Sequence, residues 1–64
     1  MNNFAKNLKE LRMDANLTQA MLAEKMGVSQ RSVSNWELGA RQPDYDPLLK
    51  LARLFDVTTD YLLL

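Results

Sequence analysis

Cysteine and histidine are both absent from this sequence, and the two absences exclude much of the chemistry that proteins carry. Without cysteine, the chain forms no disulfide and offers no thiolate to a zinc ion. Without histidine, it lacks the most frequent general base and the most frequent metal ligand. We therefore expect no bound metal, no cofactor and no enzymatic activity.

Glycine is also scarce, and long apolar runs are missing. The two glycines are too few to form a phosphate-binding loop of the type GxxxxGK followed by serine or threonine. No apolar run approaches the roughly 18 residues that cross a membrane. A length of 64 residues allows one small domain, and an apolar fraction of 47% is typical of a globular chain. We expect a single domain over residues 1–64, cytoplasmic and without a membrane partner.

Neither sign of charge is in excess, because eight basic and eight acidic residues cancel. Domains that bind nucleic acid often carry a strong positive charge, so the total does not indicate such a partner. The distribution is more informative. Residues 1–41 contain six basic and four acidic side chains, whereas residues 42–64 contain two basic and four acidic ones. The chain is therefore mildly polarised, with a basic first part and an acidic end.

Apolar residues recur with the period of a helix, and no long stretch alternates with period two. Phe4, Leu8, Leu11 and Ala15 form one stripe of a first helix. Asn16 is predicted to end this helix, because asparagine tolerates the left-handed backbone conformation found at helix ends.

Two further helices are predicted between residues 18 and 39 from their start and stop signals. Thr18 and Ser29 are candidate N-caps, and Gly27 and Gly39 are candidate terminators. The buried face of the earlier helix is formed by Leu22, Ala23 and Met26.

The last part of the chain predicts two more helices after a loop that contains Pro43. Asp46 is a candidate N-cap and Pro47 then occupies the first helical position, which is a strong start signal. A short fifth helix opens at Val57-Thr58. The apolar stripe of the fourth helix is formed by Leu48, Leu51, Ala52 and Phe55.

The stretch from about residue 18 to about residue 37 has the form of a helix-turn-helix. At about 100° per residue, Val33, Trp36 and Glu37 lie on one side of the helix that spans about residues 30–38. A DNA major groove, about 12 Å wide, admits one helix and is read by hydrogen-bonding side chains. An ordinary solvated helix also presents polar residues, but it favours glutamate and lysine, and the opposite side of this helix has neither. That side carries Arg31, Ser34, Asn35 and Leu38, with Gln30 at its exposed start.

The run LTQAMLAEKMGVSQRSVSNWELGARQPD, from Leu17 to Asp44, resembles the Cro/phage-repressor family of helix-turn-helix domains, also called XRE-like. The flanking stretches NLKELR and LLKLARLFDVTTDYLL fit the same family, so the resemblance covers roughly Phe4 to Leu63. It implies a compact all-α, five-helix domain of the lambda-repressor-like type. It also implies a cytoplasmic protein of bacterial or phage origin that binds double-stranded operator DNA as a homodimer, with its third helix in the major groove.

The resemblance further implies roles for individual residues. Arg12 is implied to pair with Glu37, whose place beside Val33 and Trp36 predicts burial and therefore a need for a partner. Trp36 is interpreted as a core residue rather than a base-stacking one. The implied base-reading residues are Gln30, Arg31, Ser34 and Asn35. The implied contacts to the DNA backbone are Thr18, Gln19, Ser29, Ser32 and Arg41. Gln19 is also implied to brace the third helix.

Three positions depart from the family pattern. Met21 stands where a glutamate usually completes a capping box, and Leu38 and Ala40 stand where polar or basic residues usually approach phosphates. Together with the zero net charge, these departures predict modest affinity for a monomer and a need for dimerisation. The candidate self-complementary interface consists of Tyr61, Leu63 and Leu64.

The sequence therefore predicts a sequence-specific DNA-binding transcriptional regulator, most simply a repressor that occupies a pseudo-palindromic operator and excludes polymerase. An alternative from another class stays open: a protein-interaction module on the same scaffold, such as an antitoxin, adaptor or anti-repressor. The neutral charge, Leu38, Ala40 and the apolar tail favour this alternative, whereas the amide-rich third helix and Gln19 favour DNA binding.

Overall fold

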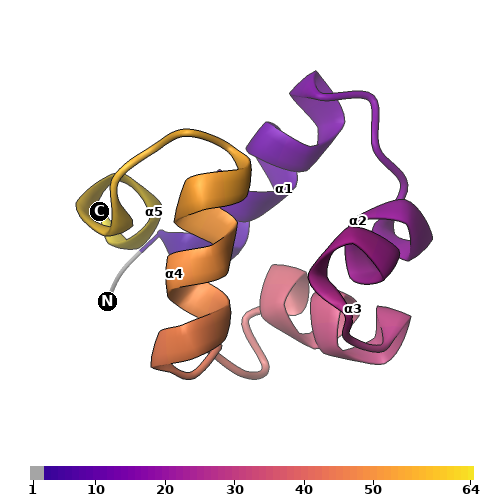
Figure 1. The fold of residues 1–64 in the computed structure, drawn as a ribbon. Helices are drawn as coiled ribbons and strands as arrows, with labels where there is room; N and C mark the ends of the chain where they lie inside the picture. The colour runs from indigo at the N-terminus through magenta and orange to yellow at the C-terminus, as the bar shows by residue number, and fades with distance from the viewer. Residues whose placement is uncertain (1–2) are drawn as a thin grey trace.

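In the computed structural model, which describes residues 3–64, the chain folds into five α-helices and no strand. They are α1 (Phe4–Asp14), α2 (Gln19–Met26), α3 (Gln30–Leu38), α4 (Tyr45–Leu54) and α5 (Thr59–Leu63). α1 contacts both α3 and α5, α2 packs on α3 and α4, and α4 packs on α5 (Figure 1). The predicted all-α, five-helix fold is confirmed.

Side-chain hydroxyls cap three of these helices at their N-termini. The backbone N–H of Met21 donates to Thr18 Oγ1 at 3.1 Å, and that of Ser32 donates to Ser29 Oγ at 3.1 Å. Tyr61 donates in the same way to Thr58 Oγ1 at 3.0 Å. Each such cap satisfies an amide that has no partner within its helix and contributes about 1 kcal/mol.

Left-handed residues end the first four helices. Gly27 and Gly39, with φ of 71° and 77°, follow α2 and α3 as predicted. Asn16, with φ of 59°, turns the chain after α1, which confirms its expected role. Asp56, with φ of 55°, does the same after α4 and carried no such expectation. Asparagine and aspartate adopt this conformation at lower cost than other non-glycine residues.

Two details of the sequence interpretation were wrong. The fourth helix begins at Tyr45 with Asp44 as its N-cap residue, so Asp46 and Pro47 lie inside its first turn. Proline is tolerated there because the first four amides of a helix have no intrahelical acceptor. Ala15, placed on the apolar stripe of the first helix, lies beyond the end of α1 at Asp14 and is exposed.

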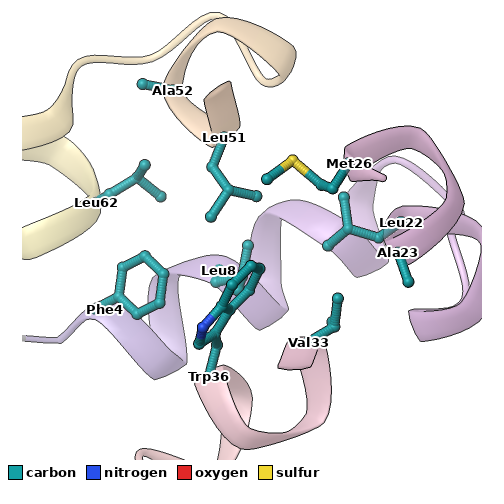
Figure 2. Close-up of a cluster of buried hydrophobic side chains, with 10 residues drawn as sticks. All are labelled: Phe4, Leu8, Leu22, Ala23, Met26, Val33, Trp36, Leu51, Ala52 and Leu62. Atoms are coloured by element: carbon teal, nitrogen blue, oxygen red, sulfur yellow. The ribbon is translucent and has the colours of Figure 1, made fainter. Parts of the chain in front are cut away.

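Every helix contributes side chains to one apolar core (Figure 2). Trp36 of α3 is buried among these residues, as its interpretation as a core residue requires. Leu17 and Val28, which precede the N-caps of α2 and α3, pack against the same core and so fix where the two helices enter. The buried residues are Phe4, Leu8, Leu22, Ala23, Met26, Val33, Trp36, Leu51, Ala52 and Leu62.

Amide side chains near the start of the described chain hold the end of α5. Asn7 Nδ2 donates to the carbonyls of Tyr61 and Leu62 at 3.0 and 3.3 Å, and Asn3 Nδ2 donates to that of Leu64 at 2.8 Å. These bonds satisfy C-terminal carbonyls that have no partner within the helix. Of the helices within residues 3–64, none is long and apolar enough to cross a membrane.

Candidate nucleic-acid interface

The turn between α2 and α3 is held from both sides. The backbone N–H of Val28 donates to the carbonyl of Ala23 at 3.0 Å, which closes the end of α2 around Gly27. From α4, Lys50 Nζ donates to the carbonyl of Met26 at 3.0 Å. The packing of α2 on α3 and on α4 completes the support, so α3 is carried on a fixed frame. The role of Lys50 gave no signal in the sequence, because a lysine on a helix surface has no distinctive pattern.

The outward side of α3 carries the four side chains expected to read bases. Gln30 and Arg31 are exposed in its first turn, and Ser34 and Asn35 are half-buried in the next. Among the described residues, these four side chains form no hydrogen bond, so their donors and acceptors remain available to a ligand. Val33 and Trp36 occupy the inward side. The structure therefore brings the four polar groups together on one accessible face.

The residues expected to contact the DNA backbone lie at the N-termini of α2 and α3 and in the loop after α3. The hydroxyls of Thr18 and Ser29 accept cap hydrogen bonds, and Ser29 Oγ lies 3.1 Å from Ser32 Oγ. A hydroxyl that accepts a cap bond keeps its own proton, so Thr18 remains able to donate to an anion. Ser29 and Ser32 share one hydrogen bond, which leaves one hydroxyl proton of the two for an anion. Arg41 is exposed in the loop that follows Gly39.

Behind this face, a buried ion pair joins α1 to α3. Arg12 Nε donates to Glu37 Oε2 at 2.6 Å, and Arg12 Nη2 donates to Glu37 Oε1 at 3.0 Å. The side chains of Arg12 and Glu37 are only 12% and 3% exposed. The hydrogen bonds that Arg12 donates to Glu37 raise the pKa of the Arg12 guanidinium, against the opposing effect of burial. Arg12 Nη1 also donates to the carbonyl of Leu17 at 2.7 Å, which ties the pair to the residue before the α2 N-cap.

Gln19 contacts α3, the helix that the family resemblance implies it braces. Its Nε2 donates to Glu37 Oε1 at 3.2 Å, so the residue expected at a phosphate is also the third member of the buried network. Gln19 is half-buried at the first position of α2. The two residues are 18 positions apart, and no helical periodicity relates positions on different helices.

Apolar side chains remain exposed away from the core. Tyr61 and Leu64, at the end of the chain, are 52% and 81% exposed, whereas Leu63 packs partly against the core. Leu38, at the end of α3, is 76% exposed.

A family model described as helix-turn-helix matches residues 8–62. The chain belongs to the helix-turn-helix family. The resemblance inferred from the sequence is thereby confirmed, and the fold places the two helices of the motif, α2 and α3, in direct contact.

Known transcriptional regulators and a repressor are similar to this chain over nearly its whole length. The HTH-type transcriptional regulator ImmR of Bacillus subtilis (strain 168) is 48% identical over 61 residues, which are 95% of this chain and 48% of that protein. A transcriptional regulator from Listeria innocua has a TM-score of 0.93 and 32% identity, covering 98% of this chain and 59% of that one. The P22 c2 repressor, solved with a synthetic operator, has a TM-score of 0.89 and 30% identity, covering 94% of this chain and 91% of that one. The chain spans about half the length of the curated relatives that it matches.

Proposed function

We propose that residues 1–64 form a DNA-binding domain that recognises an operator sequence and regulates transcription, without a catalytic step. The observation that carries this proposal is the outward face of α3, where arginine, amide and hydroxyl groups are free of internal partners and no carboxylate is exposed. The similarity to a repressor solved with a synthetic operator supports the same function. Since the partner is chromosomal or phage DNA, the site of action is the cytoplasm.

Base recognition is assigned to α3 in the major groove. The guanidinium of Arg31 has the fork geometry that donates to O6 and N7 of guanine. The side-chain amides of Gln30 and Asn35 match N6 and N7 of adenine. Ser34 contributes a hydroxyl that can bond to guanine or to adenine. The half-burial of Asn35 favours specificity, because a side chain with fewer rotamers loses less entropy on binding.

Phosphate contacts are assigned to the groups that border α3. Thr18 and Gln19 stand at the N-terminus of α2, and Ser29 and Ser32 at that of α3. Helix N-termini attract anions because their unpaired amides and the helix dipole are both positive there. Arg41, exposed beyond the end of α3, adds a full positive charge to this border.

A homodimer is the proposed binding species, and repression by excluding polymerase is the proposed outcome. Two copies would place their α3 helices in successive major grooves about 34 Å apart on a pseudo-palindromic site. The exposure of Tyr61 and Leu64 supports an interface at the chain end, to which Leu63 adds its partly exposed side chain.

The test is selection of bound duplexes from a random-sequence pool at moderate salt, using this chain. Enrichment of an inverted repeat supports sequence-specific binding by a dimer and yields the operator. Enrichment of a single half-site supports base reading by α3 and contradicts dimerisation within this chain. No enrichment by a folded sample contradicts the proposed function.

The second candidate function is a protein-interaction module. The exposure of Leu38 at 76%, together with the zero net charge, favours it, because apolar groups near phosphates gain nothing. Affinity for a generic duplex at two salt concentrations separates the candidates. For a DNA-binding domain, the logarithm of the binding constant falls with the logarithm of the salt concentration, with a slope of about −0.9 for each phosphate neutralised. An interaction module shows no such binding.

A further inference from the structure

Glu37 is buried on the inward side of α3, yet it contacts two side chains that reach the N-terminus of α2, where phosphate binding is proposed. It accepts a hydrogen bond from Gln19 Nε2 at 3.2 Å. It also holds Arg12, whose Nη1 donates to the carbonyl of Leu17 at 2.7 Å, just before the cap residue Thr18. The carboxylate of α3 thus contacts the α2 N-terminus by one direct and one indirect route.

The direct contact settles an ambiguity in the Gln19 side chain. A side-chain amide has a donor end and an acceptor end of nearly equal shape, and either end can face a given neighbour. An ionised carboxylate only accepts hydrogen bonds. Beside Glu37, the amide must therefore present its NH2 group inward, which leaves one N–H and the carbonyl oxygen for other partners.

A phosphate likewise only accepts hydrogen bonds, so it binds Gln19 solely through an N–H. If the amide were free to rotate, part of its population would present the carbonyl oxygen to the phosphate, and binding would require a reorientation. If the amide is held by Glu37, its second N–H is committed to a fixed direction before DNA arrives. Such preorganisation raises affinity because the ordering is completed in advance.

We propose that Glu37 is a positioning residue for DNA binding, which orients the amide of Gln19 so that its remaining N–H donates to a backbone phosphate. This inference rests on the proposed function. Arg12 makes the arrangement electrostatically possible, since its two hydrogen bonds at 2.6 and 3.0 Å neutralise Glu37 and prevent repulsion of the phosphate.

A purely structural role for Glu37 does not require Gln19. Each carboxylate oxygen already accepts a hydrogen bond from Arg12, which satisfies the buried charge. The bond from Gln19 is the longest of the three and comes from a half-buried residue. Its main effect is therefore on the orientation of Gln19 rather than on the stability of the pair.

A double-mutant cycle on DNA affinity tests this role. The wild-type chain, Gln19→Ala, Glu37→Gln and the double variant are titrated with the selected operator at a temperature where circular dichroism shows all four folded. Gln19→Ala is expected to weaken binding about ten- to a hundredfold, the value of a hydrogen bond to a charged group. Glu37→Gln, whose amide permits both orientations of Gln19, is expected to weaken binding of the wild-type background and to have no further effect in the Gln19→Ala background.

Additive losses in the cycle would overturn the positioning role. Leu62→Ala is the matched control, because it destabilises the core without touching the network, and its effect on affinity should be the same in both backgrounds. Failure of the wild-type chain to bind any duplex would overturn the proposed function and this inference with it. Binding by the wild-type chain with an additive cycle would overturn this inference alone.

A measurement on the wild-type chain covers the case in which Glu37→Gln does not fold. In nuclear magnetic resonance spectra of the free protein, the Nε2 proton of Gln19 that is held by the carboxylate should resonate downfield of its position in a free glutamine side chain. On titration with the operator, that proton should keep its shift and the other should move. Two shifts typical of a free glutamine side chain, before or after DNA is added, would overturn the proposal.

Discussion

Replacing Glu37 with leucine should destabilise the domain more than any surface substitution. The side chain of Glu37 is 3% exposed and accepts three hydrogen bonds. Leucine fills much of the same space but accepts none, so the Arg12 guanidinium is left at 12% exposure with the Leu17 carbonyl as its remaining acceptor. Leaving one charge of a buried pair without its partner costs about 3–5 kcal/mol.

This cost is large against the stability of so small a domain. At roughly 0.05–0.15 kcal/mol per residue, 64 residues give about 3–10 kcal/mol in total. A loss of about 1 kcal/mol lowers Tm by about 4–8 °C in domains of this size, so Glu37→Leu should lower Tm by about 12–40 °C. Thermal and urea unfolding followed by circular dichroism measure both quantities. The control is Glu24→Leu at an exposed position of α2, which should change the unfolding free energy by about 0.5 kcal/mol or less.

The double variant Arg12→Met/Glu37→Leu completes the test. With both charges gone, no buried ion is left without a partner, and the double variant should recover most of the stability lost by Glu37→Leu.

The loss of unfolding free energy caused by Glu37→Leu should be equal at pH 7 and pH 9. The pKa of Arg12 is raised in the folded state, so its contribution is complete below the ordinary arginine pKa and is lost only as the pH rises through the folded-state value. If Glu37→Leu lowers the unfolding free energy by less than about 1 kcal/mol, which is the contribution of an exposed ion pair, the reasoning is refuted.

Three further substitutions probe the proposed interface and the fold. Arg31→Ala should cost about 1–3 kcal/mol of operator affinity and relax the preference at one base pair. The control, Arg53→Ala on α4, should leave that preference intact. Equal losses of affinity on all DNA sequences would make Arg31 a phosphate contact. Leu38→Lys should tighten binding to every duplex and steepen the log–log salt slope by about 1, with little change in Tm because the position is 76% exposed. Asn7→Ala removes two hydrogen bonds to carbonyls of α5 and should cost about 1–2 kcal/mol of unfolding free energy. Amide hydrogen exchange in α5 should become faster. Unchanged exchange in α5 would contradict the role of Asn7 in holding that helix.

Helix boundaries were predictable where the signal is local. A threonine or serine cap binds an amide three residues ahead, as Thr18 and Ser29 do, so the sequence within one turn specifies the helix start. The start of α4 was misplaced because proline is compatible with several positions of the first turn, and Pro47 lies at the third. A local signal of this kind restricts the start of a helix to one turn but not to one residue.

Contacts between distant residues were beyond the reach of the sequence pattern. Asn7 binds carbonyls 54 and 55 positions away, and Lys50 binds one 24 positions away. Hydrophobic periodicity reports burial, and an amide or ammonium group that reaches a backbone carbonyl leaves no trace in it. The pairing of Arg12 with Glu37 was implied by family resemblance, whereas the burial of Glu37 followed from its helical phase beside Trp36.

The zero net charge is compatible with a DNA-binding face because the charges are unevenly placed. Glu37 contributes to the total, but it is buried and neutralised by Arg12, so a duplex at the surface of α3 does not meet it. Between residues 27 and 43, the other charged side chains are Arg31 and Arg41, both exposed. The acidic residues that follow Glu37 begin at Asp44 and lie within or next to α4 and α5. Because the proposed face carries so few cations, its nonspecific attraction to phosphates is weak. A larger share of the binding free energy must therefore come from hydrogen bonds to bases. These are the contacts that distinguish one DNA sequence from another.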